Sequence, residues 1–312
     1  MITEKFGKVV KGLGGLYEVR ISDGEETLRL ACRAKGVLKR DEEKVLIGDN
    51  VKVTIDDSTP DGIVISAVEE RKNSLIRPPL ANLDLLFIVF AAAKPSPVIE
   101  TVDKLIAIAV HNNITPIVVI TKNDVDPTAA YEFADIYRLA GIETFITSSS
   151  AGEGIEPLSE YIKNNVKDGK TAAFAGASGV GKSTLMNALF PGLTLATAEI
   201  SRKIERGRHT TRHVEIFDIE AGCNTGFLAD TPGFSLIDFA RFDFFSLDEL
   251  LPAFPDILPY LGKCRYADCA HVGEGIDECA VARAASRGSI APSRLESYRS
   301  IYRVLKEKNT YK

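Results

Sequence analysis

The 312-residue sequence predicts a protein of three parts: a small all-β barrel, a central α/β domain with a parallel sheet, and a mainly helical C-terminal part. Three observations support this prediction. Short strand patterns separated by turn residues fill the first 70 residues. Apolar strands then alternate with helical patterns from residue 83, and three of the five cysteines gather near the C-terminus.

Residues 1–70 contain five strand patterns, which glycine and Pro-Asp-Gly turn signals separate. Five strands in this length are typical of a small barrel of the OB type, whose open face often binds RNA. The expected strands are Phe6–Lys11, Leu16–Ile21, Leu28–Arg33, Asn50–Ile55 and Gly62–Ala67. Residues 71–82 are polar with paired prolines, so we expect a linker there.

Residues 83–235 alternate between apolar runs and helical patterns. Leu83–Ala91 is apolar throughout, as expected for a parallel strand buried on both faces. Such alternation predicts a parallel sheet with helices on both faces. The other expected strands are Ile114–Ile120, Glu143–Thr147, Thr171–Ala175, His213–Ile219 and Thr225–Ala229, and the expected helices are Ile99–His111, Pro127–Ala140, Gly154–Asn164 and Thr184–Phe190.

The stretch after Ala175 has the pattern G-x-x-x-x-G-K-[ST], which is typical of a phosphate-binding P-loop between a strand and a helix. Its glycines let backbone N–H groups surround an anion, and the helix N-terminus adds partial positive charge. We expect Lys182 to reach the β- and γ-phosphates of a nucleotide and the Ser183 hydroxyl to ligate Mg²⁺. The expected contacts are Gly176, Ala177, Ser178, Gly179, Val180, Gly181, Lys182, Ser183 and Thr184.

Two polar loops follow other expected strands, at the edge where open α/β sheets bind ligands. Thr121-Lys122-Asn123-Asp124 resembles the guanine-specificity motif [NT]-K-x-D of GTPases. The Asp124 carboxylate would accept hydrogen bonds from guanine N1–H and the exocyclic amine, and the Lys122 stem would cover the base. The loop Thr147–Ser150 resembles the segment behind the guanine O6, so Ser148 and Ser149 are candidate contacts.

A third loop, Asp230-Thr231-Pro232-Gly233, follows the last expected strand of the sheet. Asp230 would bind Mg²⁺ through a water, and the Gly233 N–H would sense the γ-phosphate. Between the P-loop and this loop lies a switch segment, in which Thr210 or Thr211 would complete the Mg²⁺ shell; the sequence does not choose between them.

The loops occur in an unusual order, because GTPases ordinarily begin with the P-loop and end with the guanine-specificity and serine loops. Here those two loops come first. A circular permutation explains this order, since the termini of a compact domain often lie close together and can be joined while the chain is cut elsewhere. The cut falls just after Gly233, so the C-terminal part follows directly on the γ-phosphate-sensing loop.

The cysteine cluster has the spacing Cys264-x4-Cys269-x-His271-x7-Cys279. Three thiolates and one imidazole make a closed tetrahedral set for one structural Zn²⁺. The chain ends in an expected helix, Ser293–Lys308, with Ser293 and Glu296 as a capping box.

Together, the barrel, the permuted loop order, Gly207-Arg208-His209-Thr210-Thr211 and the Cys/His cluster resemble the YjeQ/YloQ (RsgA) family of GTPases over essentially the whole chain. The resemblance implies an OB barrel at 1–70, a permuted GTPase domain at 83–235 and a zinc domain at 236–312. It also implies GTP hydrolysis stimulated by the small (30S) ribosomal subunit, late maturation of that subunit, and 16S rRNA as a partner. His209 would be catalytic.

The residue after the DxxG motif suggests an alternative function with slow GTP hydrolysis. Ras-type GTPases carry a water-orienting glutamine after DxxG, and Phe234 occupies that position here. His209, beside the switch threonines, is the candidate replacement, although it could instead contact RNA or cap the loop. The alternative function is a slowly hydrolysing, guanine-nucleotide-switched scaffold that binds rRNA.

Composition sets the remaining expectations. A net charge of −5, with 45% hydrophobic and 26% charged residues, is that of a soluble globular protein without a global nucleic-acid signature. No apolar run reaches transmembrane length, and the N-terminus lacks a signal-peptide core. We therefore expect a cytoplasmic monomer that binds GTP and GDP and makes no membrane contact.

Overall fold

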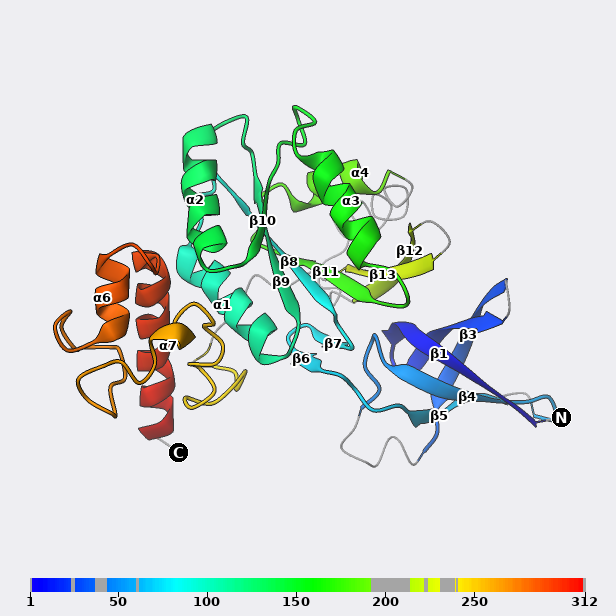
Figure 1. The fold of residues 1–312 in the computed structure, drawn as a ribbon. Helices are drawn as coiled ribbons and strands as arrows, with labels where there is room; N and C mark the ends of the chain where they lie inside the picture. The colour runs from blue at the N-terminus through cyan, green and yellow to red at the C-terminus, as the bar shows by residue number, and fades with distance from the viewer. Residues whose placement is uncertain are drawn as a thin grey trace. The chain divides into compact units, whose positions relative to one another are not determined.

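The computed structural model describes residues 2–23, 26–36, 44–59, 62–191, 214–221, 224–230, 239 and 241–310 (Figure 1). The chain divides into two compact units. The barrel unit comprises residues 1–85, 163–173 and 207–234, and the C-terminal unit comprises residues 86–162, 174–206 and 235–312.

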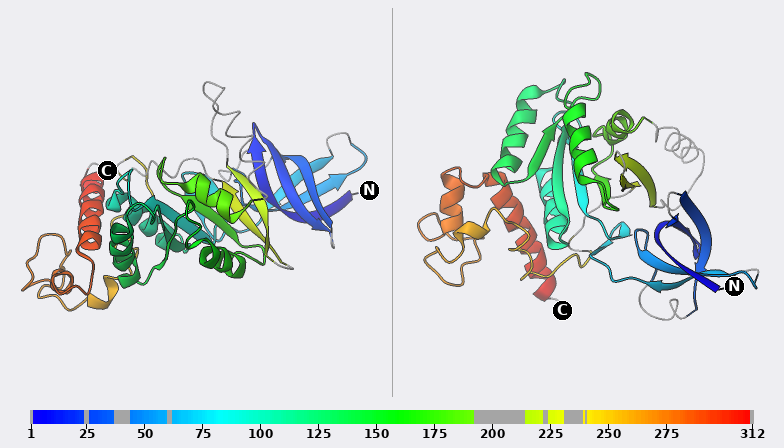
Figure 2. Two further views of the ribbon diagram at one scale, coloured as in Figure 1. Left: turned by 90° about the horizontal axis from the view of Figure 1, so that it is seen from above. Right: turned by 45° about the vertical axis from the view of Figure 1, so that its right-hand side comes forward.

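Five strands form a closed barrel in the order β1-β2-β3-β5-β4. Figure 2 shows this N-terminal part of the chain, in blue, from two further directions. They are β1 (Ile2–Leu13), β2 (Leu16–Asp23), β3 (Glu26–Ala34), β4 (Asn50–Asp56) and β5 (Ile63–Val68). Only the β3–β5 pair is parallel, because the chain crosses over between these two strands. Alternate side chains point inward and make the core, including the fully buried Val9, Val19, Val51, Val53 and Ile65.

The expected linker contains a two-stranded hairpin, β6 (Ser74–Ile76) with β7 (Pro79–Ala81). Arg71 attaches it to the barrel with two hydrogen bonds, at 2.7 and 2.9 Å, to the carboxylate of the buried Asp49. This bidentate geometry is the strongest form of a side-chain ion pair. The boundaries of the expected domains stay a prediction.

Six strands form one sheet in the order β10-β9-β8-β11-β13-β12. They are β8 (Leu85–Ala91), β9 (Thr115–Thr121), β10 (Glu143–Ile146), β11 (Thr171–Ala175), β12 (Glu215–Ala221) and β13 (Asn224–Asp230). Every residue of β8 is buried, as its apolar run predicts. Strand β12 differs from the expected parallel sheet and runs antiparallel to β13, because two strands joined by a tight connection must form a hairpin.

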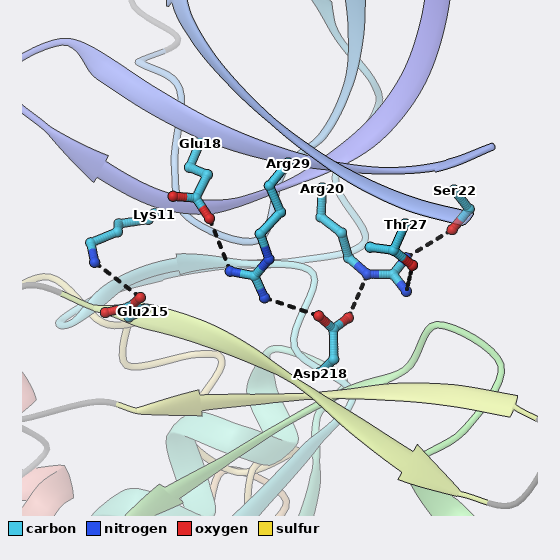
Figure 3. A network of polar contacts seen from close by, with 8 residues as sticks. All are labelled: Lys11, Glu18, Arg20, Ser22, Thr27, Arg29, Glu215 and Asp218. Carbon is cyan, nitrogen blue, oxygen red and sulfur yellow. Dashed lines mark hydrogen bonds and ion pairs between the residues drawn. The ribbon is translucent and has the colours of Figure 1, made fainter. Parts of the chain in front are cut away.

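Ion pairs connect β12 to the barrel within the barrel unit (Figure 3). Asp218 forms ion pairs with the guanidinium groups of Arg20 and Arg29, and Glu215 accepts from Lys11 at 3.0 Å. The Arg20 side chain is only 10% exposed, so water screens its pair with Asp218 less than an ordinary surface pair. The hairpin next to the switch segment is thus held by barrel side chains.

The helices are α1 (Ile99–His111), α2 (Pro127–Leu139), α3 (Ile155–Asn165), α4 (Lys182–Leu189), α6 (Ala280–Ser286) and α7 (Pro292–Thr310), with a short 3₁₀ turn, η1 (Leu258–Tyr260). Asp126 caps α2 by accepting from the Ala129 N–H, and Pro127 opens the helix where its missing N–H is not needed. Helix α7 lies beside α1 in the C-terminal unit (Figure 1).

The capping box expected at the start of α7 is wrong. The helix begins at Pro292, one residue earlier than expected, and Ser293 lies within the first turn. The Ser293 hydroxyl is buried and finds no hydrogen-bond partner within the described residues. A proline suits this position because the first helical residue has no N–H to donate.

A buried ion triad joins α7 to α1. Arg294 donates to Asp103 of α1 at 2.8 Å and to Asp256 at 2.7 Å, and the three side chains are 1%, 0% and 4% exposed. The guanidinium also lies 4.7 Å above the ring of Phe254. The triad ties the helical end of the chain to the sheet domain, 191 residues apart in sequence.

Candidate functional site

The expected P-loop joins β11 to α4. Strand β11 is buried at all five residues, and α4 starts at Lys182, so the loop emerges from the sheet and runs into a helix N-terminus. Gly181 caps α4 at φ 91°, a left-handed conformation that favours glycine. A Cβ on Gly176 would lie 2.2 Å from the carbonyl oxygen of Val89, so only glycine lets the loop pass this close to β8.

The loop exposes the groups that phosphate binding needs. Ala177, Ser178 and Gly179 are exposed at its tip, and Ser183 and Thr184 are exposed in the first turn of α4. The Lys182 ammonium lies 3.4 Å from the Gly176 carbonyl, so its side chain folds back over the loop. Backbone N–H groups, a helix N-terminus and a lysine at one place form an anion-binding site.

The loop after β9 touches the P-loop directly. Lys122, at φ 61°, donates from its ammonium to the carbonyls of Gly179 at 2.9 Å and Lys94 at 2.5 Å. The buried Thr121 hydroxyl shares its hydrogen bond between the carbonyls of Val180 and Phe90. Two loops more than 50 residues apart are therefore held side by side, as one nucleotide spanning both would require.

Asp124 is held by the serine loop that follows β10. Its carboxylate accepts from Ser148 at 2.6 Å and from Ser150 at 2.9 Å. These two hydrogen bonds hold the pKa of the Asp124 carboxyl below its ordinary value, so the group is ionised at neutral pH. The sequence predicts a contact for Ser149 and none for Ser150. Ser150 nevertheless reaches Asp124, because the turn Ser148–Ala151 folds back on itself.

Asn123, between Lys122 and Asp124, contacts the other side of the serine loop. Its amide donates to Glu153 at 2.9 Å, while its Oδ1 is buried without a partner in the described residues. A buried carbonyl oxygen without a donor is unfavourable, which makes this atom a candidate acceptor for an incoming ligand.

The remaining expected contacts are only partly described. Asp230 is the last residue of β13, the strand next to β11 in the sheet. Gly233, His209, Thr210 and Thr211 lie outside the described residues. The assignments of these residues stay predictions.

The cysteine cluster is assembled at the start of α6. The Nδ1 of His271 lies 3.6, 3.3 and 3.5 Å from the sulfurs of Cys264, Cys269 and Cys279. Zinc bound tetrahedrally to sulfur at about 2.3 Å and nitrogen at about 2.0 Å sets a sulfur–nitrogen separation of about 3.5 Å. The four ligand atoms all lie within 4.8 Å of one another, so they fit one tetrahedral metal ion such as zinc.

Neighbouring groups orient these ligands. The Ala280 N–H donates to the Cys264 sulfur at 3.3 Å, and the Ala282 N–H donates to the Cys279 sulfur at 3.4 Å. Burial by itself would raise the pKa of the Cys264 thiol, but hydrogen bonds such as that from the Ala280 N–H lower it below its ordinary value. Arg299 of α7 donates to the His271 carbonyl at 3.0 Å, which connects the cluster to the closing helix.

The fold and the loops define a class. A P-loop, a guanine-type loop and a serine loop at one edge of an α/β sheet, in permuted order and preceded by a β barrel, make this a circularly permuted GTPase. The chain belongs to the RsgA GTPase family: the model of the RsgA GTPase matches residues 68–240, and that of the RsgA N-terminal domain matches residues 6–64. It is therefore an enzyme that hydrolyses GTP.

Relatives match over nearly the whole chain. The small ribosomal subunit biogenesis GTPase RsgA of Geobacillus thermodenitrificans is 38% identical, covering 97% of this chain and 98% of that protein. The protein of the same name from Agathobacter rectalis is 34% identical, covering 98% and 99%.

Two solved structures also match over nearly the whole chain. YloQ, a circularly permuted GTPase, is similar with a TM-score of 0.75 and 31% identity over 98% of this chain and 96% of its own. YjeQ from Thermotoga maritima is similar with a TM-score of 0.75 and 32% identity over 97% and 99%. In the part of this chain that is described, no helix is long and apolar enough to cross a membrane.

Proposed function

We propose that this GTPase is stimulated by the small ribosomal subunit and acts in late maturation of that subunit, with 16S rRNA as its partner and the cytoplasm as its place of action. The supporting observation is the contact of Lys122 with Gly179 beside the Asp124–Ser148–Ser150 cluster, which fits one guanine nucleotide across two loops. The relatives' shared name, small ribosomal subunit biogenesis GTPase, supports the choice of subunit. We expect the protein to act as a monomer.

The proposed roles follow from the chemistry at each position. Asp124 selects guanine, Lys182 neutralises the β- and γ-phosphates, and the Gly233 N–H senses the γ-phosphate. Ser183, with Thr210 or Thr211, would hold Mg²⁺, which would neutralise charge on the phosphates; Asp230 would reach the same ion through a water. His209 would orient the attacking water.

The Cys264–Cys279 cluster would hold one structural Zn²⁺. All four positions of its tetrahedron are filled by protein atoms, so no position is open for a reacting water. Its role is to fold residues 264–280 against α7, which presents the C-terminal part to a partner.

The test is GTP turnover with and without purified small subunits. We expect small subunits to raise phosphate release at least about tenfold, because a bound partner would fix His209 where it orients the attacking water. Purified large subunits at equal rRNA mass serve as the control, and Lys182→Ala, which we expect to lose nucleotide binding, gives the background.

Phe234 supports the alternative function, because a phenyl ring cannot orient water as a glutamine does. Equal turnover with and without small subunits, together with GTP-dependent binding to them, would favour a slowly hydrolysing scaffold. Equal turnover without such binding would contradict both functions.

A further inference from the structure

An open cavity of about 620 Å³ belongs to the barrel unit. It is lined by residues of β1, β2, β4 and β13, by Lys72 and Asn82, and by residues 168–169. Its volume falls within the range of small-ligand sites, about 300–1,000 Å³. None of its lining residues belongs to the nucleotide loops or to the cysteine cluster. The proposed function therefore leaves this cavity without a role.

Lys8 of β1 is the unusual residue of the lining. It is only 8% exposed, yet no hydrogen bond or ion pair joins its ammonium to another described residue. The Phe227 ring lies beside this ammonium, with its centroid 5.2 Å from Nζ. A ring face attracts a cation but supplies no acceptor, so the Lys8 ammonium lacks a direct hydrogen-bond acceptor among the described residues. The nearby carboxylates Asp84 and Asp49 favour its charged form without contacting it.

The other charged groups of the lining are already paired. Arg20 is bound by Asp218, Ser22 and Thr27 (Figure 3). Lys72 donates to Asp84 at 3.0 Å, and Asp168 is the acidic member of the lining. Asp218 neutralises Arg20, and Asp84 neutralises Lys72. Lys8 is therefore the cation of the lining that makes no ion pair with a described residue.

An aromatic ring stands at the same cavity. Phe6 lines it and is 62% exposed, which is uncommon for a phenylalanine in a strand. Exposed aromatic rings beside cations are the arrangement that binds single nucleotides, because the ring stacks on the base while the cation binds the phosphate.

We propose that this cavity binds a nucleoside monophosphate unit, with its phosphate on Lys8 and its base on Phe6. The unit is either a free nucleotide or one residue of an RNA strand. The site is separate from the GTP site and does not depend on hydrolysis.

The probes are AMP, adenosine and an octamer of single-stranded oligoadenylate. Binding to the full-length protein is measured by titration calorimetry in saturating GDP and Mg²⁺, so that the P-loop is occupied. We expect AMP to bind and adenosine to bind at least about tenfold more weakly, since a charge-assisted hydrogen bond contributes at least that factor. Phe6→Ala should weaken AMP about fivefold or more, the value of one lost stacking contact.

Lys8→Met is the decisive variant and Lys5→Met its matched control. Both remove one positive charge from β1, but Lys5 does not line the cavity. We expect Lys8→Met to reduce AMP affinity at least about tenfold and Lys5→Met to leave it within twofold. Because burial disfavours the Lys8 charge and the ammonium makes no hydrogen bond or ion pair with a described residue, its replacement by an apolar side chain should not lower the melting temperature. Lys72→Met, at a 63% exposed side chain, provides a second variant if Lys8→Met fails to fold.

Binding should also depend on pH. Burial lowers the pKa of Lys8 to about 8; Asp84 and Asp49 oppose the shift, and Lys72 adds to it. The ammonium therefore loses its proton as the pH rises through about 8, while the AMP phosphate stays doubly charged above its own pKa of about 6. Affinity for AMP should fall between pH 7 and pH 9 in the wild type and stay flat in Lys8→Met.

The outcomes separate the two sources. If Lys8→Met weakens the octamer by the same factor as AMP, the site takes a residue of an RNA strand. If it weakens AMP alone, the site takes a free nucleotide. If neither probe binds the GDP-loaded protein, or if Lys8→Met and Lys5→Met behave alike, the proposal is wrong, whatever the result with ribosomal subunits.

Discussion

At the scale of single residues, Asp124 carries the selectivity we propose for the nucleotide. Two serine hydroxyls hold its carboxylate in one orientation, and those hydrogen bonds lower its pKa further below neutral pH. An oriented acceptor of this kind can take two N–H donors on one edge of a purine. Guanine presents that pair of donors and adenine does not.

Asp124→Asn tests this role. The amide can accept only one hydrogen bond where the carboxylate accepts two, and it presents an N–H group that suits xanthine instead. We expect GTP affinity to fall at least about tenfold and xanthosine triphosphate affinity to rise, because hydrogen bonds to a charged group contribute about 1.5–3 kcal/mol. Competition binding with both nucleotides measures the ratio.

Asp126→Asn serves as the control for Asp124→Asn. Asp126 lies two residues further along and caps α2, so its replacement changes the same charge without touching the serine loop. An unchanged preference for GTP over xanthosine triphosphate in Asp124→Asn would contradict the assignment of this loop to the base.

At the scale of secondary-structure elements, α7 is attached to α1 through one arginine. Arg294 neutralises Asp103 and Asp256, and all three side chains are almost fully buried. Burial raises the pKa of Asp103 despite the adjacent Arg294, and its Oδ2 finds no hydrogen-bond partner within the described residues. The two carboxylates therefore rely on the guanidinium.

Arg294→Met should destabilise this attachment strongly. Removing one member of a buried ion group leaves uncompensated charge, which costs about 3–5 kcal/mol. Arg303→Met is the matched control on the same helix, because Arg303 pairs with Glu296 at 54% and 62% exposure and such pairs contribute about 0–1 kcal/mol. Urea unfolding followed by far-ultraviolet circular dichroism gives both values, and equal losses in the two variants would refute the distinction.

At the scale of the whole molecule, the cysteine cluster holds together residues 261–279, which contribute little to the hydrophobic core. Between η1 and α6 the described chain is mostly turns, with few buried apolar residues, and the four ligands connect residues 264–279 to one another. Small folds of this kind depend on a metal for stability.

The protein as purified should therefore contain one zinc per chain by elemental analysis. Metal removal with a strong chelator should lower the free energy of unfolding by several kcal/mol, because structural zinc contributes directly to folding. Limited proteolysis should then cut within residues 258–291 first. GDP affinity should change less than about twofold, since no hydrogen bond or ion pair joins the described nucleotide loops to the cluster. Asp268→Asn, beside a ligand but not one itself, is the control for zinc content.

Local sequence patterns predict much of the architecture. The G-x-x-x-x-G-K-[ST] spacing requires a particular turn between strand and helix, and the structure has that turn at Gly176–Lys182. The five barrel strands and the central helices likewise follow from the spacing of apolar residues along the chain. Apolar residues alternate with polar ones in a half-buried strand and recur every three to four residues on the buried face of a helix. The order of the loops along the chain was sufficient to indicate the permutation.

Partnerships between distant residues came from the tertiary structure alone. The sequence determined that a serine loop exists, but the fold of its turn decided that Ser150 reaches Asp124. Likewise, nothing local marks Arg294 as the partner of Asp103, or Lys8 as a buried cation beside Phe227. The physical reason is the sequence separation of the interacting residues. A turn or a helix is determined by residues that are neighbours along the chain, whereas the partners of a buried charge belong to whichever distant elements pack against it.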